Sequence, residues 1–346
     1  MNEIIEHSII PGTILDWYDV NKRDLPWRKD REPYHIWVSE IMLQQTRVEA
    51  VKGYYSRFIN ALPTVNMLAD ADDAVLHKLW EGLGYYSRVR NMKKAANCIM
   101  DVYGGVFPQD YDLILSLPGI GPYTAGAICS IAFDLPTPAV DGNVLRLLSR
   151  IFNDESNIDD LSTKRRFTEL LRGIYPHRAG DFTQALMELG ATVCGPNSAP
   201  DCKNCPCKQV CLGYLNGTAH RLPVRNAKKQ RRIEKKTVLI LQCEDSFALC
   251  KRPDNGLLAS MWQFPELDGW HDVDGLVLEM EKKGIQVTEI ERQVERKHVF
   301  THVEWHMRGF YTRVRNRLSD FVWMDVEQIR CEAALPTAFR MFLDEI

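Results

Sequence analysis

The chain has 346 residues, of which 45% are hydrophobic and 26% charged, and its formal net charge is -3. This composition is typical of a folded globular protein, and it excludes a disordered, collagen-like or small disulfide-stapled chain. The length predicts two or three domains. No stretch has the roughly 18 apolar residues of a membrane helix, and the N-terminus is acidic where a signal peptide is basic, so we expect a cytosolic protein. The near-neutral charge does not by itself indicate a nucleic-acid partner.

Residues 7–190 are predicted to be mostly helical, because their apolar residues recur at spacings of three and four. The expected helical stretches are 36–58, 74–80, 89–102, 123–133 and 144–152. Further along, residues 222–236 lose their apolar residues and gather arginines and lysines. This basic segment is predicted to link two domains.

The chain after the basic segment is typical of an α+β domain. Residues 237–241 and 247–250 predict a strand hairpin, and residues 298–314 continue the strand-like composition. One helix is expected over 274–283, ended by Gly284, and another over 337–343.

A turn at residues 117–125, Leu-Pro-Gly-Ile-Gly-Pro-Tyr-Thr-Ala, is predicted to bind DNA phosphate. Gly119 and Gly121 permit a tight turn, and Pro122 is suited to the first position of the next helix. The free N–H groups at that helix start can bind an anion without a basic side chain. The alternative is an ordinary turn between two helices.

Two carboxylates are candidates for acid–base chemistry. Glu40 lies in an otherwise apolar helical stretch, where a solvated glutamate at the edge of a helix face is the alternative. Asp141 precedes an amphipathic helix, where it could simply cap the helix. A neutral carboxyl and an ionised one are together the minimum set for cleaving a glycosidic bond.

Four of the ten cysteines, Cys194, Cys202, Cys205 and Cys211, fall within 18 residues, and a fifth, Cys207, lies among them. In a reducing compartment such a group indicates a metal site. Both a 4Fe-4S cluster and a structural zinc ion accept four thiolates, and the spacing alone leaves both open.

Several of these motifs occur together and in order. Residues 40–46, 82–88, 117–125 and 140–144, the four cysteines, the basic linker and the β-rich tail resemble the MutY family of adenine DNA glycosylases. The resemblance implies an all-α helix-hairpin-helix glycosylase region over 1–221, with a 4Fe-4S cluster loop near 190–213. A linker over 222–236 and an α+β Nudix-like domain over 237–346, which recognises 8-oxoguanine, would follow.

The resemblance also implies a mechanism. Glu40 would protonate an adenine that has left the helical stack, and Asp141 would face the positive charge that develops on the sugar. Tyr123 and Asn143 would position these groups. Tyr123 stands where endonuclease III-like relatives carry a lysine nucleophile, which implies a monofunctional glycosylase.

Further contacts with a duplex containing adenine opposite 8-oxoguanine or guanine follow from the same resemblance. Gln45 and Tyr85 would wedge into the stack, and Thr301 and His302 would face 8-oxoguanine, with Thr301 replacing the family's serine. The remaining implied DNA or adenine contacts are Arg23, Gln44, Arg88, Leu117, Gly119, Gly121 and Gln184.

The resemblance implies that Cys194, Cys202, Cys205 and Cys211 bind one 4Fe-4S cluster. The gap between Cys194 and Cys202 has seven residues, one more than is usual in the family. We expect a monomer, with repair or replication partners docking on the linker. Two alternative functions remain open at this stage: an endonuclease III-like glycosylase and lyase, and a non-catalytic binder of DNA lesions. The tail lacks the glutamates of a Nudix hydrolase.

Overall fold

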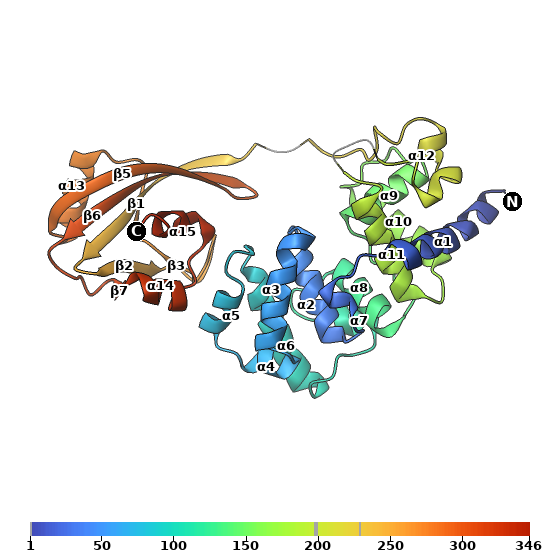
Figure 1. Cartoon of the computed structure of the whole chain (residues 1–346), viewed down its shortest axis with the longest axis horizontal. Coiled ribbons are helices and arrows are strands. Elements are labelled where there is room, and N and C mark those ends of the chain that lie inside the picture. Colours follow the sequence, from blue (N-terminus) through green and yellow to red (C-terminus); the bar gives the residue numbers. More distant parts are fainter. Residues whose placement is uncertain (1, 197–199, 228–229) are drawn as a thin grey trace. The chain divides into compact units, whose positions relative to one another are not determined.

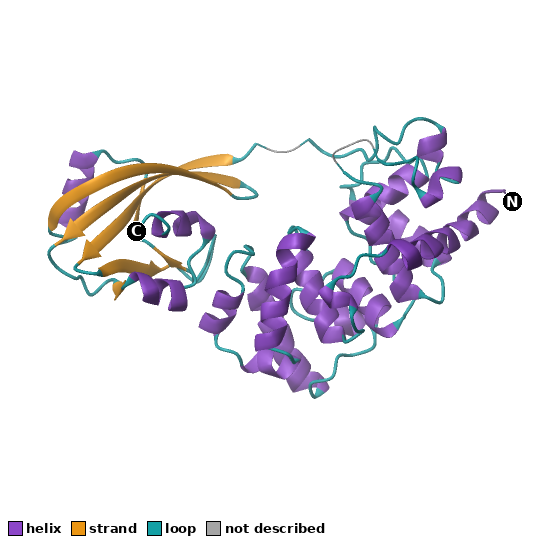
Figure 2. Ribbon diagram, viewed as in Figure 1, coloured by secondary structure: helices purple, strands orange, loops and turns teal. Residues whose placement is uncertain are grey.

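A computed structural model describes residues 2–196, 200–227 and 230–346. The chain forms two compact units (Figure 1). The first comprises residues 1–70 and 91–227, and the second comprises residues 71–90 and 228–346. Figure 2 shows that the first unit is helical and that the strands lie in the second. This arrangement confirms the predicted fold class.

The helical unit is built from short helices joined by Gly-, Pro- and Asp-containing turns. The helices before and around the hairpin are α1 (Asn2–Asn21), η1 (Pro26–Arg28), α2 (Pro33–Leu43), α3 (Val48–Ala61), α4 (Val65–Asp70), α6 (Ser87–Tyr103), α7 (Tyr111–Leu115) and α8 (Pro122–Phe133). They are followed by α9 (Gly142–Ile151), α10 (Leu161–Ile174), α11 (Ala179–Thr192), η2 (Pro206–Gln209) and α12 (Leu212–Leu215). Helix α5 (Asp73–Leu79) belongs to the second unit, and the unit boundary falls within α6.

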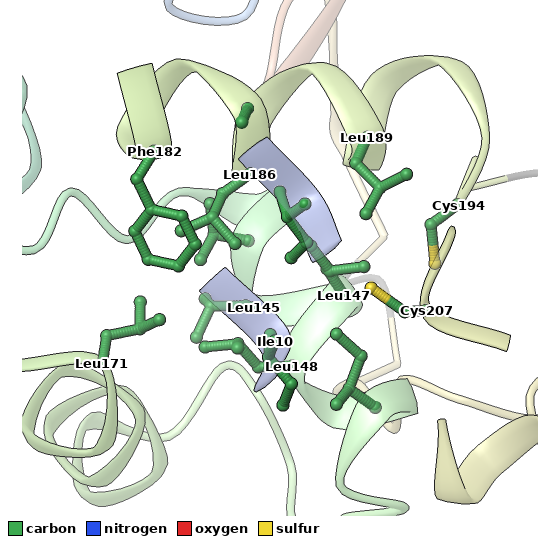
Figure 3. Close-up of a cluster of buried hydrophobic side chains, with 14 of the residues drawn as sticks. Ile10, Leu145, Leu147, Leu148, Leu171, Phe182, Leu186, Leu189, Cys194 and Cys207 are labelled. Carbon is green, nitrogen blue, oxygen red and sulfur yellow. The ribbon is translucent and has the colours of Figure 1, made fainter. Parts of the chain in front are cut away.

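One core cluster of this unit forms where α1, α9, α10 and α11 pack together. Buried leucines of α9 and α11 contact Phe182 and Leu171 there, and Cys194 and Cys207 lie at the edge of the same core (Figure 3). Burial of this apolar surface fixes α9 against α11. These two helices carry several of the candidate site residues.

The expected single helix over 36–58 is instead two helices. Helix α2 ends at Leu43 and α3 begins at Val48, because Gln45 adopts the left-handed conformation with a φ of 58°. A helix cannot continue through such a residue. The break places Gln44 and Gln45 in a turn.

The second unit contains a seven-stranded sheet in which five strands follow the order β3-β2-β1-β6-β5, while β4 pairs with β1 and β7 pairs with β2. Its strands are β1 (Arg232–Cys243), β2 (Ser246–Lys251), β3 (Trp262–Gln263), β4 (Glu266–Asp268), β5 (Val287–Val299), β6 (Val303–Val314) and β7 (Val322–Met324). Strands β1 and β6 are parallel, and the pairs of β1 with β2 and of β5 with β6 are antiparallel. The predicted hairpin over 237–250 is therefore confirmed.

The helices of this unit are α13 (Val273–Lys282), α14 (Val326–Glu332) and α15 (Thr337–Leu343) besides α5. Two apolar clusters cover the sheet: one contains Phe339 and Phe342 of α15, and the other contains Leu276 and Met280 of α13. The expected helices over 274–283 and 337–343 are confirmed, and α14 was not predicted.

The sheet begins inside the segment that was expected to be linker. Strand β1 starts at Arg232, and its backbone pairs with β6 from that residue onward. Backbone hydrogen bonds need no apolar side chains, so the charged residues 232–236 join the strand. Lys228 and Lys229 of the expected linker lie outside the described residues. Within the described part of the chain, no helix is both long and apolar enough to cross a membrane.

Candidate active site and cysteine loop

A cleft of about 510 Å³ opens in the helical unit. The predicted residues that line it are Arg23, Glu40, Gln44, Gln45, Tyr123, Asp141, Asn143 and Gln184. They come from the turn after α1, the end of α2, the start of α8, the start of α9 and the middle of α11. The fold thus brings together residues that are up to 161 positions apart in sequence (184 minus 23).

Glu40 lies on α2 with only 5% of its surface exposed. Burial raises the pKa of its carboxyl to about 7, because a low-dielectric environment penalises the charged form. The nearby Asp141 raises this pKa too, whereas a hydrogen bond from Tyr123 opposes the shift. The Tyr123 hydroxyl donates to Glu40 Oε2 at 2.5 Å. A carboxyl in this state can carry a proton near neutral pH.

Asp141 caps α9, as the simpler interpretation of the sequence predicted, and it also faces the cleft. Its Oδ1 accepts backbone N–H groups of Asn143 and Val144 at 2.9 and 2.8 Å, and its Oδ2 accepts the Asn143 side-chain amide at 2.8 Å. Burial raises the pKa of the Asp141 carboxyl, and these hydrogen bonds oppose that rise. The helix start also favours its negative charge.

Sequence reasoning missed two charged residues of the cleft, Glu188 and Arg28. The Glu188 side chain is 1% exposed, and its carboxylate binds Arg23 at 2.5 Å and Arg28 at 2.8 Å. Burial alone would raise the pKa of the Glu188 carboxyl, but its hydrogen bonds and ion pairs with Arg23 and Arg28 hold this pKa below its usual value. The sequence does contain a signal for Glu188, because this acid stands between the apolar residues Met187 and Leu189. An acid in an apolar stretch was also the reason for predicting Glu40.

Tyr85 lies in the loop between α5 and α6, and Arg88 lies in the first turn of α6, both within the second unit. Tyr85 is 44% exposed and has a φ of 49°, so the turn directs a large side chain outward. Its hydroxyl hydrogen-bonds to the Oγ1 of Thr301 in the loop between β5 and β6. The Arg88 guanidinium donates to backbone oxygens of Leu83 and Gly84 at 3.0 and 3.1 Å. Arg88 therefore supports the loop that presents Tyr85.

The predicted phosphate-binding turn connects α7 and α8. Gly119 has a φ of 77°, and a Cβ there would come within 2.5 Å of the Asn91 Cβ, so glycine is required. Gly121 precedes α8, and Pro122 occupies the first turn. Leu117 is buried, so its side chain anchors the turn and only its backbone is available to a ligand.

Thr301 and His302 are exposed at the tip of the β5–β6 hairpin. His302 lines a second cavity, of about 480 Å³, within the second unit. Phe300 anchors this tip, because its ring packs edge-on against Trp305 with 4.8 Å between ring centroids.

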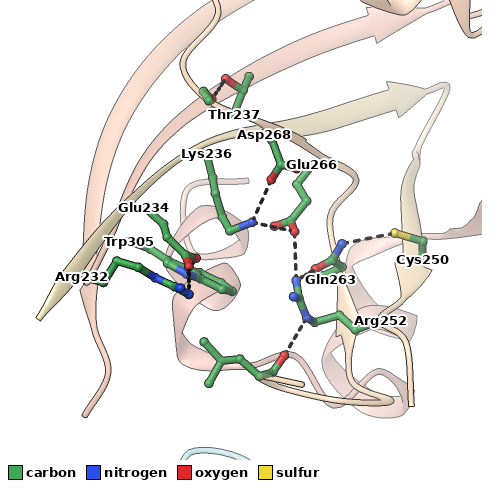
Figure 4. A network of polar contacts seen from close by, with 12 residues as sticks. Arg232, Glu234, Lys236, Thr237, Cys250, Arg252, Gln263, Glu266, Asp268 and Trp305 are labelled. Atoms are coloured by element: carbon green, nitrogen blue, oxygen red, sulfur yellow. Dashed lines mark hydrogen bonds and ion pairs between the residues drawn. The ribbon is translucent and has the colours of Figure 1, made fainter. Parts of the chain in front are cut away.

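A charged network surrounds Trp305 in that cavity (Figure 4). Lys236 and Arg252 lie over its ring at 5.0 and 5.4 Å, and both bind Glu266 Oε1, at 3.0 and 3.1 Å. Its indole N–H donates to Glu234 Oε2 at 2.8 Å. The network fixes the β1–β6 framework from which the exposed hairpin tip extends.

The cysteine loop brings all four predicted ligands and Cys207 to the wall of one small cavity. Residues 197–199 of the first gap lie outside the described residues. Arg150 donates to the Sγ of Cys194 at 3.2 Å, which suits a thiolate. Across the described residues, no three Cys, His, Asp or Glu side chains are grouped closely enough to hold a single metal ion. An all-sulfur donor set fits an iron–sulfur cluster.

Helix α9 connects this loop to the cleft. Its buried Arg146 donates to Asn143 Oδ1 at 2.9 Å, to the Gly190 carbonyl at 2.7 Å and to the Cys194 carbonyl at 2.8 Å. One guanidinium thus fixes the start of α9, the end of α11 and the first cysteine.

Two family models match the chain, in the order of its two folds. The first, described as the HhH-GPD superfamily base excision DNA repair protein, matches residues 38–173, and the second, the NUDIX domain, matches residues 237–345. An adenine DNA glycosylase of Buchnera aphidicola is 34% identical over 96% of this chain and 95% of its own length. The chain belongs to the adenine DNA glycosylase family. Other family members include the adenine DNA glycosylase of Rattus norvegicus, which is 32% identical over 98% of this chain and 78% of its own length. The chain spans only 55% of the length of the Arabidopsis thaliana member, at 36% identity.

Solved structures of other enzymes share the helical region of this family member. A thermostable thymine-DNA glycosylase is similar with a TM-score of 0.57 and 28% identity, over 62% of this chain and all of its own. A non-covalent endonuclease III–DNA complex has a TM-score of 0.51 at 22% identity, covers 60% of this chain and 95% of its own, and shows a common fold. The predicted family and fold are thereby confirmed.

Proposed function

We propose that the cleft hydrolyses the N-glycosidic bond of adenine in duplex DNA in which adenine faces 8-oxoguanine or guanine. The observation that carries this proposal is the pair formed by Glu40 and Asp141. One carboxyl has a pKa of about 7, and the other is held by three hydrogen bonds at a helix start. Such a pair supplies one acid and one ionised carboxylate at neutral pH.

Each carboxyl has a distinct role in this proposal. Glu40 transfers its proton to a ring nitrogen of the flipped-out adenine, so that the base leaves as a neutral group. The glycosidic bond breaks, and the sugar gains oxocarbenium character that Asp141 stabilises until water adds. Tyr123 holds Glu40, and Asn143 holds Asp141.

The ion-pair cluster provides a basis for selecting adenine. The Watson–Crick edge of adenine presents an N–H donor beside a nitrogen acceptor. Glu188 offers acceptor oxygens, and Arg23 and Arg28 offer donors, in fixed positions on the cleft wall. We assign adenine recognition to these three residues and Gln184, which also lines the cleft.

The reaction proposed here leaves the DNA strand intact. A lyase step needs an amine that forms a Schiff base with the sugar. The Tyr123 side chain is a phenol already bonded to Glu40, and the described residues that line the cleft include no lysine. This supports a monofunctional glycosylase over an endonuclease III-like lyase.

The proposed duplex contacts come from both units. The amides at the start of α8, next to Gly119 and Gly121, would bind a phosphate. Gln44 would lie beside the flipped base, and Gln45 would wedge into the stack. In the second unit, Tyr85 and Thr301 form one hydrogen-bonded pair that would meet the base opposite adenine, with His302 next to it. We propose that DNA is this protein's partner, that the protein acts as a monomer, and that residues 222–236 can dock other repair proteins.

We further propose that Cys194, Cys202, Cys205 and Cys211 hold one 4Fe-4S cluster. Their common cavity and the cation of Arg150 next to Cys194 support this ligand set. When bound, the cluster would cross-link the loop and add to the folding free energy. The chain's own residues carry out the base removal.

The function is tested by single-turnover incubation with duplexes that hold one adenine opposite 8-oxoguanine, guanine or thymine, or one thymine glycol. We expect adenine release from the first two duplexes, with strand breaks only after alkali. Release from the thymine glycol duplex with strand breakage before alkali would instead identify an endonuclease III-like enzyme. Binding without any base release would identify a lesion binder.

The rate of adenine release is expected to fall with rising pH above about 7, the pKa of Glu40. Burial raises this pKa, so the proton that the reaction needs is present below that pH and lost above it. The Tyr123→Phe variant removes a hydrogen bond that favours the ionised form, so its basic limb should move to higher pH. Single-turnover rates from pH 5 to 9 locate the basic limb of the unmodified protein and of the variant. A limb that stays in place or moves to lower pH in Tyr123→Phe contradicts the assignment.

The Tyr85–Thr301 pair is expected to set the preference for 8-oxoguanine over guanine. Tyr85→Phe and Thr301→Val should each reduce the ratio of the two rates about fivefold, the effect of one hydrogen bond. In the double variant, the ratio of the two rates should fall little further than in the more affected single variant. Fully additive losses would show that the two hydroxyls act separately. Thr288→Val, on the exposed side of β5, serves as the control.

A further inference from the structure

The first part of the expected linker, residues 222–226, packs against the helical unit. Leu222 is buried, and its carbonyl accepts a hydrogen bond from an arginine of α9 at 3.0 Å. The Val224 carbonyl accepts a backbone N–H from the loop between α9 and α10 at 3.1 Å. The Asn226 backbone N–H donates to Asp159 Oδ2 in the same loop at 3.0 Å. This segment therefore follows a fixed path along the helical unit.

The fixed path places Arg225 at the start of α9. Its Nη2 lies 3.9 Å from the position that a Cβ on Gly142 would occupy. Gly142 is the first residue of α9 and lines the cleft, directly after Asp141. A cation thus stands beside the part of the cleft wall that is proposed to face the sugar.

The Arg225 guanidinium can still take a ligand. Its side chain is 57% exposed, and its ion pair joins Nε to Asp159 Oδ1 over 3.6 Å, which is longer than a hydrogen bond. A guanidinium has five N–H donors, so this weak contact leaves donors for an anion. Gly142 adds no side chain between the guanidinium and the cleft, and a glycine lets the backbone of a ligand approach closely.

We propose that Arg225 binds a phosphate of the adenine-containing strand, next to the nucleotide that loses its base. The inference rests on the proposed function, because Asp141 defines where the sugar lies. The two phosphates that flank this nucleotide are bonded to its sugar, so a sugar at Asp141 keeps them near the start of α9. A guanidinium pairs with phosphate oxygens through two parallel N–H groups. Arg225 would fix the position of the nucleotide without reading its sequence.

The test measures the affinity for a duplex in which a tetrahydrofuran analogue of the abasic site faces 8-oxoguanine, so that no reaction occurs during binding. Arg225→Gln should weaken binding about tenfold, the effect of one hydrogen bond to a charged group. The slope of log affinity against log salt should become shallower by about 0.9, the effect of one phosphate contact. Arg172→Gln on α10 is the matched control, since Arg172 is 53% exposed and also pairs with a carboxylate. It should change the affinity less than about twofold.

Neutral phosphates in the same duplex locate the contact. A methylphosphonate on one side of the abasic analogue should weaken binding of the unmodified protein about tenfold and leave that of Arg225→Gln unchanged, because the two changes remove the same interaction. Equal losses in both proteins for a methylphosphonate on either side would overturn the proposal.

Asp159→Asn separates phosphate binding from a structural role of Arg225. An asparagine oxygen can still accept the Asn226 N–H, so the segment stays in place while the charge that competes for Arg225 is removed. We expect the affinity to stay the same or to rise. A loss as large as that of Arg225→Gln would show that the arginine only holds the segment, and would overturn the phosphate contact.

Adenine release by the unmodified protein distinguishes failure of this inference from failure of the proposed function. Release of adenine with unchanged affinity in Arg225→Gln would overturn the phosphate contact alone. An unmodified protein that neither releases adenine nor prefers the abasic duplex to an undamaged one would overturn the proposed function and the contact with it.

Discussion

Glu40→Gln should reduce single-turnover adenine release on the order of 10³-fold, within the range that a general acid contributes. Glutamine has nearly the same shape and can still accept the Tyr123 hydroxyl, but it has no proton to give to the base. The effect therefore isolates proton transfer. Quantification of free adenine from the 8-oxoguanine duplex gives the rate.

Measurements of DNA affinity and of thermal unfolding test whether Glu40→Gln changes only the proton transfer. DNA affinity and the unfolding transition should match those of the unmodified protein, because an amide suits a buried site at least as well as a carboxylate. Glu169→Gln provides a matched control, since Glu169 is exposed on α10 and pairs with Arg172 one turn away. Retention of the full rate by Glu40→Gln would refute its role as the acid.

Asp141→Asn is the second change with a large expected effect, a loss of 10²-fold to 10³-fold, which is typical of removing one electrostatic contact to a transition state. An asparagine oxygen can still accept the N–H groups of Asn143 and Val144, so α9 keeps its cap. The variant loses the negative charge facing the sugar and also the hydrogen bond from the Asn143 side-chain amide to Oδ2, because an amide NH2 cannot accept it. Asp110→Asn, at the equivalent cap of α7, should leave the rate unchanged.

The pH dependence distinguishes this charge effect from misfolding. The negative charge of Asp141 raises the pKa of Glu40, so its removal should lower that pKa and move the basic limb to lower pH. Tyr123→Phe moves the same limb the other way. A misfolded cleft would produce neither pattern, and an unmoved limb in Asp141→Asn would contradict the proposed proximity of the two carboxyls.

The sequence predicted what depends on local pattern. Glu40 stood out as an acid among apolar residues, and burial of that stretch is what raises its pKa. The helices at 123–133 and 144–152 and the helix at 337–343 followed from spacing and capping residues. The family was found because several motifs recur in order, and the comparisons confirm it.

Long-range pairing could not be predicted in this way. Glu188 and Arg23 are 165 residues apart, and no local signal joins them. The pairing of Tyr85 with Thr301 spans 216 residues. The break after α2 was missed because a left-handed glutamine is uncommon, and the start of β1 was missed because strand pairing there involves backbone groups. Such features depend on tertiary contacts, which the spacing of apolar residues along the sequence does not reveal.

Helix α9 links the cysteine loop to the catalytic cleft, although the loop itself does not line the cleft. Its ten residues extend for about 15 Å, with Asp141 at one end and Arg150 bonded to Cys194 near the other. A short helix held at both ends moves as one piece, so a loop that loses its metal would displace the carboxylate. With the cluster in place as proposed, the supply of iron and sulfide in a cell would set how many of these molecules can remove a mispaired base.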